Sequence, residues 1–237
     1  MNAIVIIPTY NERENVAAIV ERVLAIANLR VMIVDDDSPD GTGEEADLLR
    51  SRHGDRLLVL HRSGSRGLGR SYCDGMRAAL DFDVEFICQM DADFSHDPAD
   101  LPRLVDAGAS ADLVVGSRYV PGGSVHNWPR RRLWLSAFAN RYVRAITGLP
   151  VHDCTSGFRC WRRELIARLP LDRIVSDGYA FQVELTWAAH VHGARILEVP
   201  IAFVERRQGA SKMSGPIIAE SALLPWRLAV RGRRPGR

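Results

Sequence analysis

Cysteine is scarce, the two signs of charge nearly cancel, and no long hydrophobic run is present in the sequence. The 237-residue chain has 31 Lys and Arg against 29 Asp and Glu, so its net charge of +2 excludes a strongly polyanion-coating protein. We therefore expect no nucleic acid among its partners. The four cysteines form no C-x-x-C pair and no Cys/His metal spacing, which favours reduced thiols in a cytosolic protein.

Membrane-spanning and export signals are also missing from the sequence. The apolar run that begins at Ala3 ends at Pro8, too soon for the hydrophobic region of a signal peptide. A transmembrane helix needs about 20 apolar residues. The best candidate stretch, residues 217–230, is interrupted by Glu220, Pro225 and Arg227. We expect a globular protein that is not integral to a membrane.

Short apolar runs alternate with amphipathic segments in the first half of the chain. This alternation predicts an α/β fold, with a mainly parallel, Rossmann-like sheet flanked by helices on both faces. The second half is less regular, with an extended stretch at 196–204, a polar loop at 205–215 and an amphipathic helix at 217–230. The expected strands of the first half are residues 3–7, 31–34, 57–60, 85–90 and 113–116. Apolar residues at helical spacing predict the first helix over 16–27, and the later expected helices are residues 44–51, 71–82, 100–107, 133–147 and 181–192.

Acidic residues follow several of the expected strands. Asp35, Asp36 and Asp37 come after the second strand, and Asp91 and Asp93 come after the fourth. Ligands of such sheets bind at the carboxyl ends of the strands. A D-x-D pair there can present oxygens to one divalent cation that also takes phosphate oxygens, which is the chemistry of a nucleotide-diphosphate site. Taken singly, the D-x-D is more often a solvated turn, and residues 35–42 could also form only a turn.

Six motifs together resemble the inverting glycosyltransferases of family 2, and among them the polyprenol-phosphate (dolichol-phosphate) mannose synthases. The resemblance spans about residues 4–215 in the family's order. It implies a GT-A fold, GDP-mannose as donor, a phosphorylated polyprenol as acceptor, and Mg²⁺ or Mn²⁺ as cofactor. The motifs are IIPTYNE at 6–12, VDDDSPDGT at 34–42, MDADFSH at 90–96, GSRY at 116–119, TSGFR at 155–159 and Ser211-Lys212.

The resemblance also implies roles for individual residues. Asp91 and Asp93 would bind the metal, and with Arg118 they would form the catalytic set. Arg130 to Arg132 could hold the acceptor phosphate or merely flank an interfacial helix; we expect Arg130, Arg131 and Ser211 to contact the phosphate. The implied donor-binding residues are Pro8, Tyr10, Glu12, Val34, Asp36, Asp91, Ala92, Asp93, Arg118, Arg206 and Lys212.

The acceptor determines the expected mechanism. A phosphate monoester has a second pKa of about 6, so it is already mostly dianionic at neutral pH and needs no general base. Direct displacement would invert the anomeric centre and give a β-linked mannosyl phosphate lipid. Three alternatives stay open: a donor such as UDP-glucose, an acceptor hydroxyl, and a non-catalytic module that binds nucleotide sugars.

A lipid acceptor also implies contact with a membrane. Apolar residues at 133–146 and 217–226, bordered by arginines, could lie on the cytoplasmic face of the membrane, and packing into the core or on a partner is an equally open alternative. We therefore expect a peripheral enzyme, with a membrane protein as a possible partner. The expected division is a catalytic domain at 1–215 and a C-terminal amphipathic helix with a basic tail at 216–237.

Overall fold

A computed structural model describes residues 2–205 and 215–232 of the chain. Its central sheet has seven strands in the order β3-β2-β1-β4-β7-β5-β8, and β6 pairs with β9 in a second, small sheet. Within the central sheet β7 runs antiparallel to both neighbours, and the other pairs are parallel. The strands are β1 (Ala3–Thr9), β2 (Leu29–Asp35), β3 (Leu57–His61), β4 (Phe86–Gln89), β5 (Leu113–Ser117), β6 (Ser124–His126), β7 (Arg159–Arg162), β8 (Ile196–Pro200) and β9 (Ala202–Val204).

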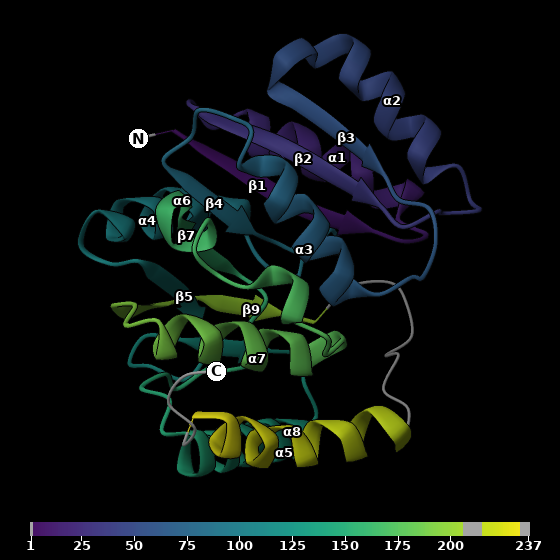
Figure 1. The fold of residues 1–237 in the computed structure, drawn as a ribbon. Helices are drawn as coiled ribbons and strands as arrows, with labels where there is room; N and C mark the ends of the chain where they lie inside the picture. Colours follow the sequence, from purple (N-terminus) through teal and green to yellow (C-terminus); the bar gives the residue numbers. More distant parts are fainter. Residues whose placement is uncertain (1, 206–214, 233–237) are drawn as a thin grey trace.

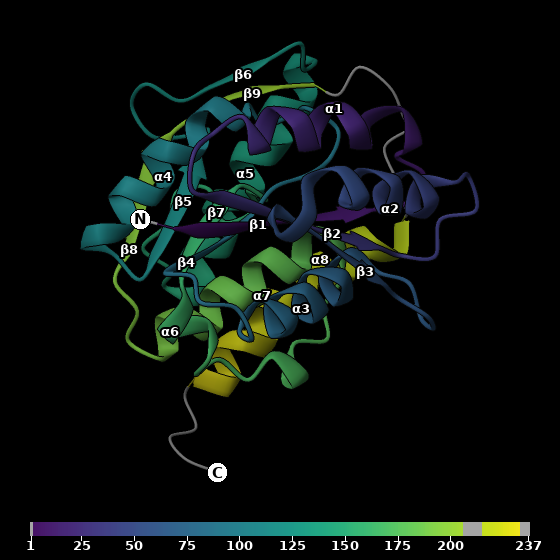
Figure 2. The same ribbon diagram turned by 90° about the horizontal axis from the view of Figure 1, so that it is seen from above.

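Helices cover both faces of this sheet, which confirms the predicted fold class. Figure 2 shows α1 and α4 on one side of the strands and α3 and α7 on the other. The helices are α1 (Arg13–Leu24), α2 (Thr42–His53), α3 (Leu68–Ala79), α4 (Leu101–Ala107), α5 (Arg130–Thr147), α6 (Arg163–Ile166), α7 (Gly178–Val191) and α8 (Gly215–Gly232).

The core consists of two layers, one on each face of the sheet. In β1, Ile4 and Ile6 pack toward α3 and α7, whereas Val5 and Ile7 pack toward α1 and α4. All four side chains are completely buried. A strand that is covered on both faces is expected to be almost continuously hydrophobic, and this is why β1 could be recognised from the sequence.

The second half departs from the sequence prediction in several elements. The strands β6 and β7 and the short helix α6 were missed, and the extended stretch at 196–204 is divided at Ile201 into β8 and β9, which belong to different sheets. The helix expected at 217–230 is present as α8, with Pro225 inside it. Most of the predicted polar loop at 205–215 lies outside the described residues.

The C-terminal helix α8 packs on α5 and α7 (Figure 1). Leu224 and Leu228 are buried in the core layer that contains α7. The Trp226 indole donates to Tyr142 Oη at 2.9 Å, and Tyr142 Oη donates to the Ala222 carbonyl at 2.7 Å. No helix of the described residues is both long and apolar enough to cross a bilayer. The division between a catalytic domain and a C-terminal unit stays a prediction.

Candidate active site

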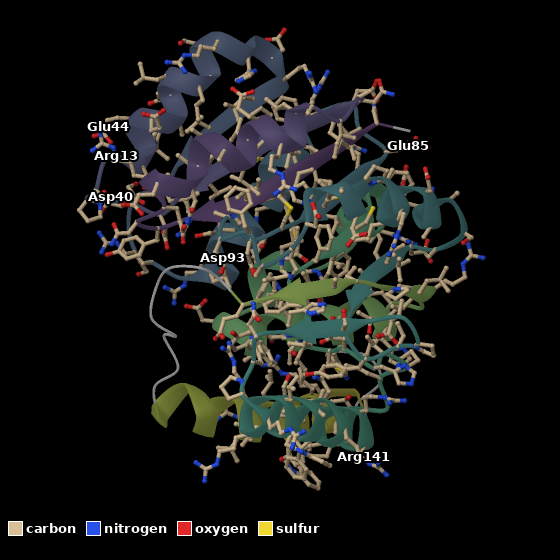
Figure 3. All side chains as sticks on the ribbon, turned by 180° about the vertical axis from the view of Figure 1, so that it is seen from behind. Arg13, Asp40, Glu44, Glu85, Asp93 and Arg141 are labelled. Carbon is tan, nitrogen blue, oxygen red and sulfur yellow. The ribbon has the colours of Figure 1, made fainter. Side chains whose placement is uncertain are left out.

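A cavity of about 690 Å³ lies at the carboxyl ends of β1, β2, β4 and β5. Figure 3 shows Asp93, which follows β4, on the opposite side of the molecule from Glu85, which precedes it. Val34 lies in the core instead, and Arg130 and Arg131 are exposed outside the lining. Arg206, Ser211 and Lys212 lie outside the described residues. The predicted site residues that line the cavity are Pro8, Tyr10, Glu12, Asp36, Asp91, Ala92, Asp93 and Arg118.

The two acids after β4 are each held by a hydroxyl group. Tyr72 Oη donates to Asp91 Oδ1 at 3.1 Å, and Ser95 Oγ donates to Asp93 Oδ1 at 2.6 Å. Beside Asp91, a Cβ on Gly157 would lie 3.2 Å from Oδ2, so the glycine leaves room next to the carboxylate. Burial, and then Asp91, raise the pKa of Tyr72 well above its usual value, so the phenol remains a donor.

These acids fit a hard divalent cation. Mg²⁺ is commonly bound by one or two carboxylates, and substrate phosphates and waters complete its coordination. Among the described residues no group of three or more His, Cys, Asp or Glu side chains is placed to hold a metal. An ion at Asp91 and Asp93 would therefore depend on phosphate oxygens for further ligands, as expected at a nucleotide-diphosphate site.

His96 lies behind the acids and is almost fully buried. Its ring stacks on Phe158 with centroids 5.0 Å apart, and its Nδ1 lies 3.9 Å from Asp91 Oδ2. Burial lowers the pKa of His96 to about 4, although the nearby Asp93 opposes this shift. The imidazole is therefore neutral at physiological pH, and within the described residues its Nδ1 has no hydrogen-bond partner.

The acidic run after β2 divides into residues with different contacts. Asp35 accepts a 2.6 Å hydrogen bond from Ser38 Oγ, and Asp40 accepts one of 2.6 Å from Thr42 Oγ1 at the start of α2. Both belong to the turn, so the turn interpretation holds for them. Asp36 instead lines the cavity, where Arg62 forms an ion pair with Oδ1 and the Gly67 amide donates to Oδ2 at 2.8 Å.

Arg118 is buried in an ion pair that the sequence did not reveal. Its Nε and Nη2 each donate to a different oxygen of Asp153 at 2.6 Å, and Asp153 is completely buried. Nη2 also donates to Thr155 Oγ1 at 2.8 Å. Burial opposes the positive charge, but Asp153 outweighs it and raises the pKa of Arg118. The arginine thus keeps its charge beside the cavity without any ligand.

A second cation, Arg132, lines the cavity near Arg118 on the β5 side. Its guanidinium lies 4.0 Å from the centroid of a Trp128 ring, and it donates to Glu205 Oε1 at 2.6 Å. Because consecutive residues of a helix point about 100° apart, only one residue of the Arg130–Arg132 run can face the cavity. The structure selects Arg132.

A mainly parallel sheet with a D-x-D pair beyond β4 and a buried arginine beyond β5 defines a glycosyltransferase of the GT-A type. The family model described as Glycosyl transferase family 2 matches residues 4–169. The chain belongs to this family.

Relatives and solved structures agree with this assignment. The polyprenol monophosphomannose synthase of Mycolicibacterium smegmatis is 49% identical, and the match covers 97% of this chain and 88% of the relative. The undecaprenyl-phosphate mannosyltransferase of Micrococcus luteus is 45% identical, with 98% and 96% covered. Glucosyl-3-phosphoglycerate synthase of Mycobacterium tuberculosis, solved with Mn²⁺ and UDP, has the same fold with a TM-score of 0.68, at 18% identity over 99% of this chain and 81% of that one.

Proposed function

We propose that this chain transfers mannose from GDP-mannose to the phosphate of a polyprenyl phosphate, with inversion, to give a β-mannosyl phosphoryl polyprenol. One observation carries the proposal: a single cavity has the D-x-D acids beyond β4 and the cations Arg118 and Arg132 beyond β5. A donor diphosphate and an acceptor phosphate can therefore bind side by side. The names of the two close relatives support mannose as the sugar and a polyprenyl phosphate as the acceptor.

In this reaction Asp91 and Asp93 would hold Mg²⁺ or Mn²⁺. The ion would offset the charge of the leaving diphosphate. Tyr72 fixes the orientation of Asp91, and Ser95 that of Asp93, by the hydrogen bonds described above. Arg118 lines the cavity as the positive end of its buried ion pair with Asp153. No residue need remove a proton because the acceptor is already an anion.

We assign the acceptor phosphate to Arg132 in place of Arg130 and Arg131. Arg132 lines the cavity, whereas its two neighbours are exposed and do not. An arginine can bind a phosphate through two parallel N–H groups. Glu205 Oε1 accepts a hydrogen bond from Arg132 Nη1, so an incoming phosphate would exchange with this carboxylate.

The membrane contact of the enzyme is assigned to an aromatic face on α5 and α8, made of Trp134, Leu135, Phe138, Leu223 and Trp226. All five side chains are at least half exposed, and Trp134 reaches 78%. Figure 3 shows Arg141 at this end of the molecule, away from Asp93. Exposed aromatic side chains beside arginines are typical of helices that lie in a membrane interface. The face supports peripheral binding at the cytoplasmic leaflet, with or without a membrane-protein partner.

Transfer of label into lipid tests the reaction. Radiolabelled GDP-mannose and UDP-glucose are each offered with polyprenyl phosphate, with and without a chelator. We expect label from GDP-mannose only, lost with chelator and in Asp93→Asn. Asp97→Asn serves as the control, because Asp97 is an exposed partner of Arg22 outside the cavity. Transfer from UDP-glucose alone would contradict the donor assignment.

Steady-state kinetics tests the acceptor site. Arg132→Ala is expected to raise the KM for polyprenyl phosphate with little change in the KM for GDP-mannose. Arg131→Ala, the neighbouring residue with the same charge, is expected to change neither strongly. An equal effect of the two substitutions would mean that Arg132 contributes only to the general charge of the helix.

Vesicle flotation tests the aromatic face. Trp134→Ser with Phe138→Ser is expected to reduce binding to anionic vesicles, whereas Leu48→Ser with Val191→Ser, two exposed apolar residues outside this face, is not. Equal flotation of both double variants would refute this docking surface.

A further inference from the structure

Arg66 lies at the edge of the cavity, on the segment between β3 and α3, and has no role in the reaction as derived above. Its Nη1 donates to Tyr10 Oη at 2.8 Å, and its guanidinium lies 4.7 Å from the centroid of the Tyr10 ring. Its Nη2 donates to the Asp37 carbonyl at 3.0 Å and to Asp37 Oδ2 at 3.1 Å. Asp37 has a left-handed backbone with φ of 58°, and its carbonyl oxygen and Oδ2 both accept from Arg66.

The layout of the cavity places Arg66 where the nucleobase would bind. The diphosphate belongs with Asp91 and Asp93 beyond the central strand β4. The cations assigned to the acceptor lie beyond β5, on one side of β4 in the sheet order. The nucleoside must therefore extend to the other side, beyond β1 and β2. The lining there includes Tyr10, Asp36 and Arg66.

The chemistry of guanine matches an arginine at this position. Guanine presents O6 and N7 as adjacent acceptors, and an arginine fork is the commonest protein group to read them. Uracil has O4 but no ring nitrogen acceptor beside it. Carboxylates such as Asp36 suit the N–H donors on the remaining edge of guanine. A site with both an arginine and an acid can thus favour guanine over uracil.

The present contacts of Arg66 do not prevent this role. They use at most three of its five N–H groups. In the ion pair with Asp37, 47% of the Arg66 side chain and 73% of the Asp37 side chain are exposed. Exposed ion pairs contribute little stability. The side chain can therefore turn its donors from Asp37 toward a base while it stays against the Tyr10 ring.

We propose that Arg66 is a specificity-determining residue that donates hydrogen bonds to O6 and N7 of the guanine base of the donor. This inference rests on the proposed use of a guanosine nucleotide. A cation at this position could instead bind the diphosphate, and that role would lower the affinity for every nucleoside diphosphate alike. The two roles are distinguished by an experiment that varies both the nucleobase of the ligand and the residue at position 66.

The test is a binding cycle with GDP, 7-deaza-GDP and UDP, measured by calorimetry at one fixed Mn²⁺ concentration. 7-deaza-GDP lacks only the N7 acceptor. Because only one of the two hydrogen bonds is lost, we expect wild-type protein to bind GDP about 2- to 12-fold more tightly than 7-deaza-GDP, the range for a single hydrogen bond. In Arg66→Ala this ratio should fall toward one. Arg66→Lys, which keeps the charge but loses the fork, should also reduce it.

Arg50→Ala is the matched control. Arg50 on α2 forms an exposed ion pair with Asp47, as Arg66 does with Asp37, and it does not line the cavity. This variant should retain the wild-type preference for GDP. Thermal melts of each variant establish that the protein is folded.

Three outcomes would overturn the inference. An equal ratio in wild-type protein and Arg66→Ala would show that Arg66 does not contact N7. An equal loss of GDP and UDP affinity in Arg66→Ala would assign it to the diphosphate. In both cases GDP-mannose could remain the donor. Only wild-type protein that binds UDP and not GDP would overturn the proposed donor as well.

Discussion

Replacing Asp153 by Asn removes the only negative charge that faces the buried guanidinium of Arg118 in the described ion pairs. The two side chains are 4% and 0% exposed, so water cannot compensate for the loss. Asparagine has nearly the same volume, and no cavity is created. Asp153 now accepts from three N–H groups of Arg118, the backbone amide, Nε and Nη2. The asparagine amide offers one acceptor oxygen in place of two, so at least one of these groups loses its partner.

The expected loss of stability is large. Breaking a buried ion pair by removing one partner costs about 3–5 kcal/mol, because a buried charge is left uncompensated. For a chain of this size each kcal/mol lowers the melting temperature by about 2–4 °C. Asp153→Asn should therefore lower the free energy of unfolding by about 4 kcal/mol and the melting temperature by roughly 8–16 °C.

Urea denaturation of three variants measures this effect and its cause. Asp97→Asn breaks the exposed pair with Arg22 and should cost less than about 1 kcal/mol. Arg118→Met combined with Asp153→Asn leaves neither charge of this pair, so it should be more stable than Asp153→Asn alone, by about 2 kcal/mol. The reasoning is refuted if Asp153→Asn costs less than Asp97→Asn, or if removing Arg118 as well restores nothing.

Three further predictions concern buried groups elsewhere. All four cysteines are buried, and burial raises the pKa of Cys73 and Cys154 to about 12, so a thiol reagent at pH 8 should react with at most one thiol before unfolding and with four after it. Burial lowers the pKa of His96 to about 4, below its unfolded value of about 6.5. Between these pH values the unfolded chain takes up a proton that the folded chain does not. In chelator, wild-type protein should therefore lose up to roughly 3 kcal/mol relative to His96→Phe as pH falls from 7 to 4, with a constant difference above 7. Gly69→Ala would place a Cβ 2.6 Å from the Ser176 carbonyl oxygen, so it should cost about 1–3 kcal/mol in urea denaturation; an unchanged midpoint would contradict the close packing of α3.

The parallel strands could be predicted because their composition reflects burial on both faces. The strand β7 could not, since it has four residues and begins and ends with arginine. Arg159 is completely buried there, and it donates to the carbonyls of Cys154, Ser156 and Gln182. A sequence shows an arginine but not the three carbonyl groups that make its burial possible. Tertiary hydrogen bonds therefore decided where this strand lies.

The site residues that lie at the carboxyl edge of the sheet could be predicted because that edge itself could be predicted. Residues that directly follow β1, β2, β4 and β5 had to meet, so Tyr10, Asp36, Asp93 and Arg118 could be grouped in advance. Their partners could not be identified: Arg62 follows β3, and Asp153 lies in an irregular segment after α5. A polar residue directly after a predicted strand is the signal that could have singled out Arg62. Asp153 carried no such signal.

The carboxylates that pair with Arg118 and Arg132 also determine which of the two arginines can attract the acceptor phosphate. The charge of Arg118 is balanced by the completely buried Asp153, which has no route to solvent and is not displaced. Arg132 is paired with Glu205, but both side chains are about one-third exposed, so this carboxylate can move away when a phosphate arrives. Among the described residues of the β5 side, the exchangeable positive charge is therefore that of Arg132. Arg118 then acts as a fixed dipole with Asp153, and acceptor affinity should depend on ionic strength mainly through Arg132.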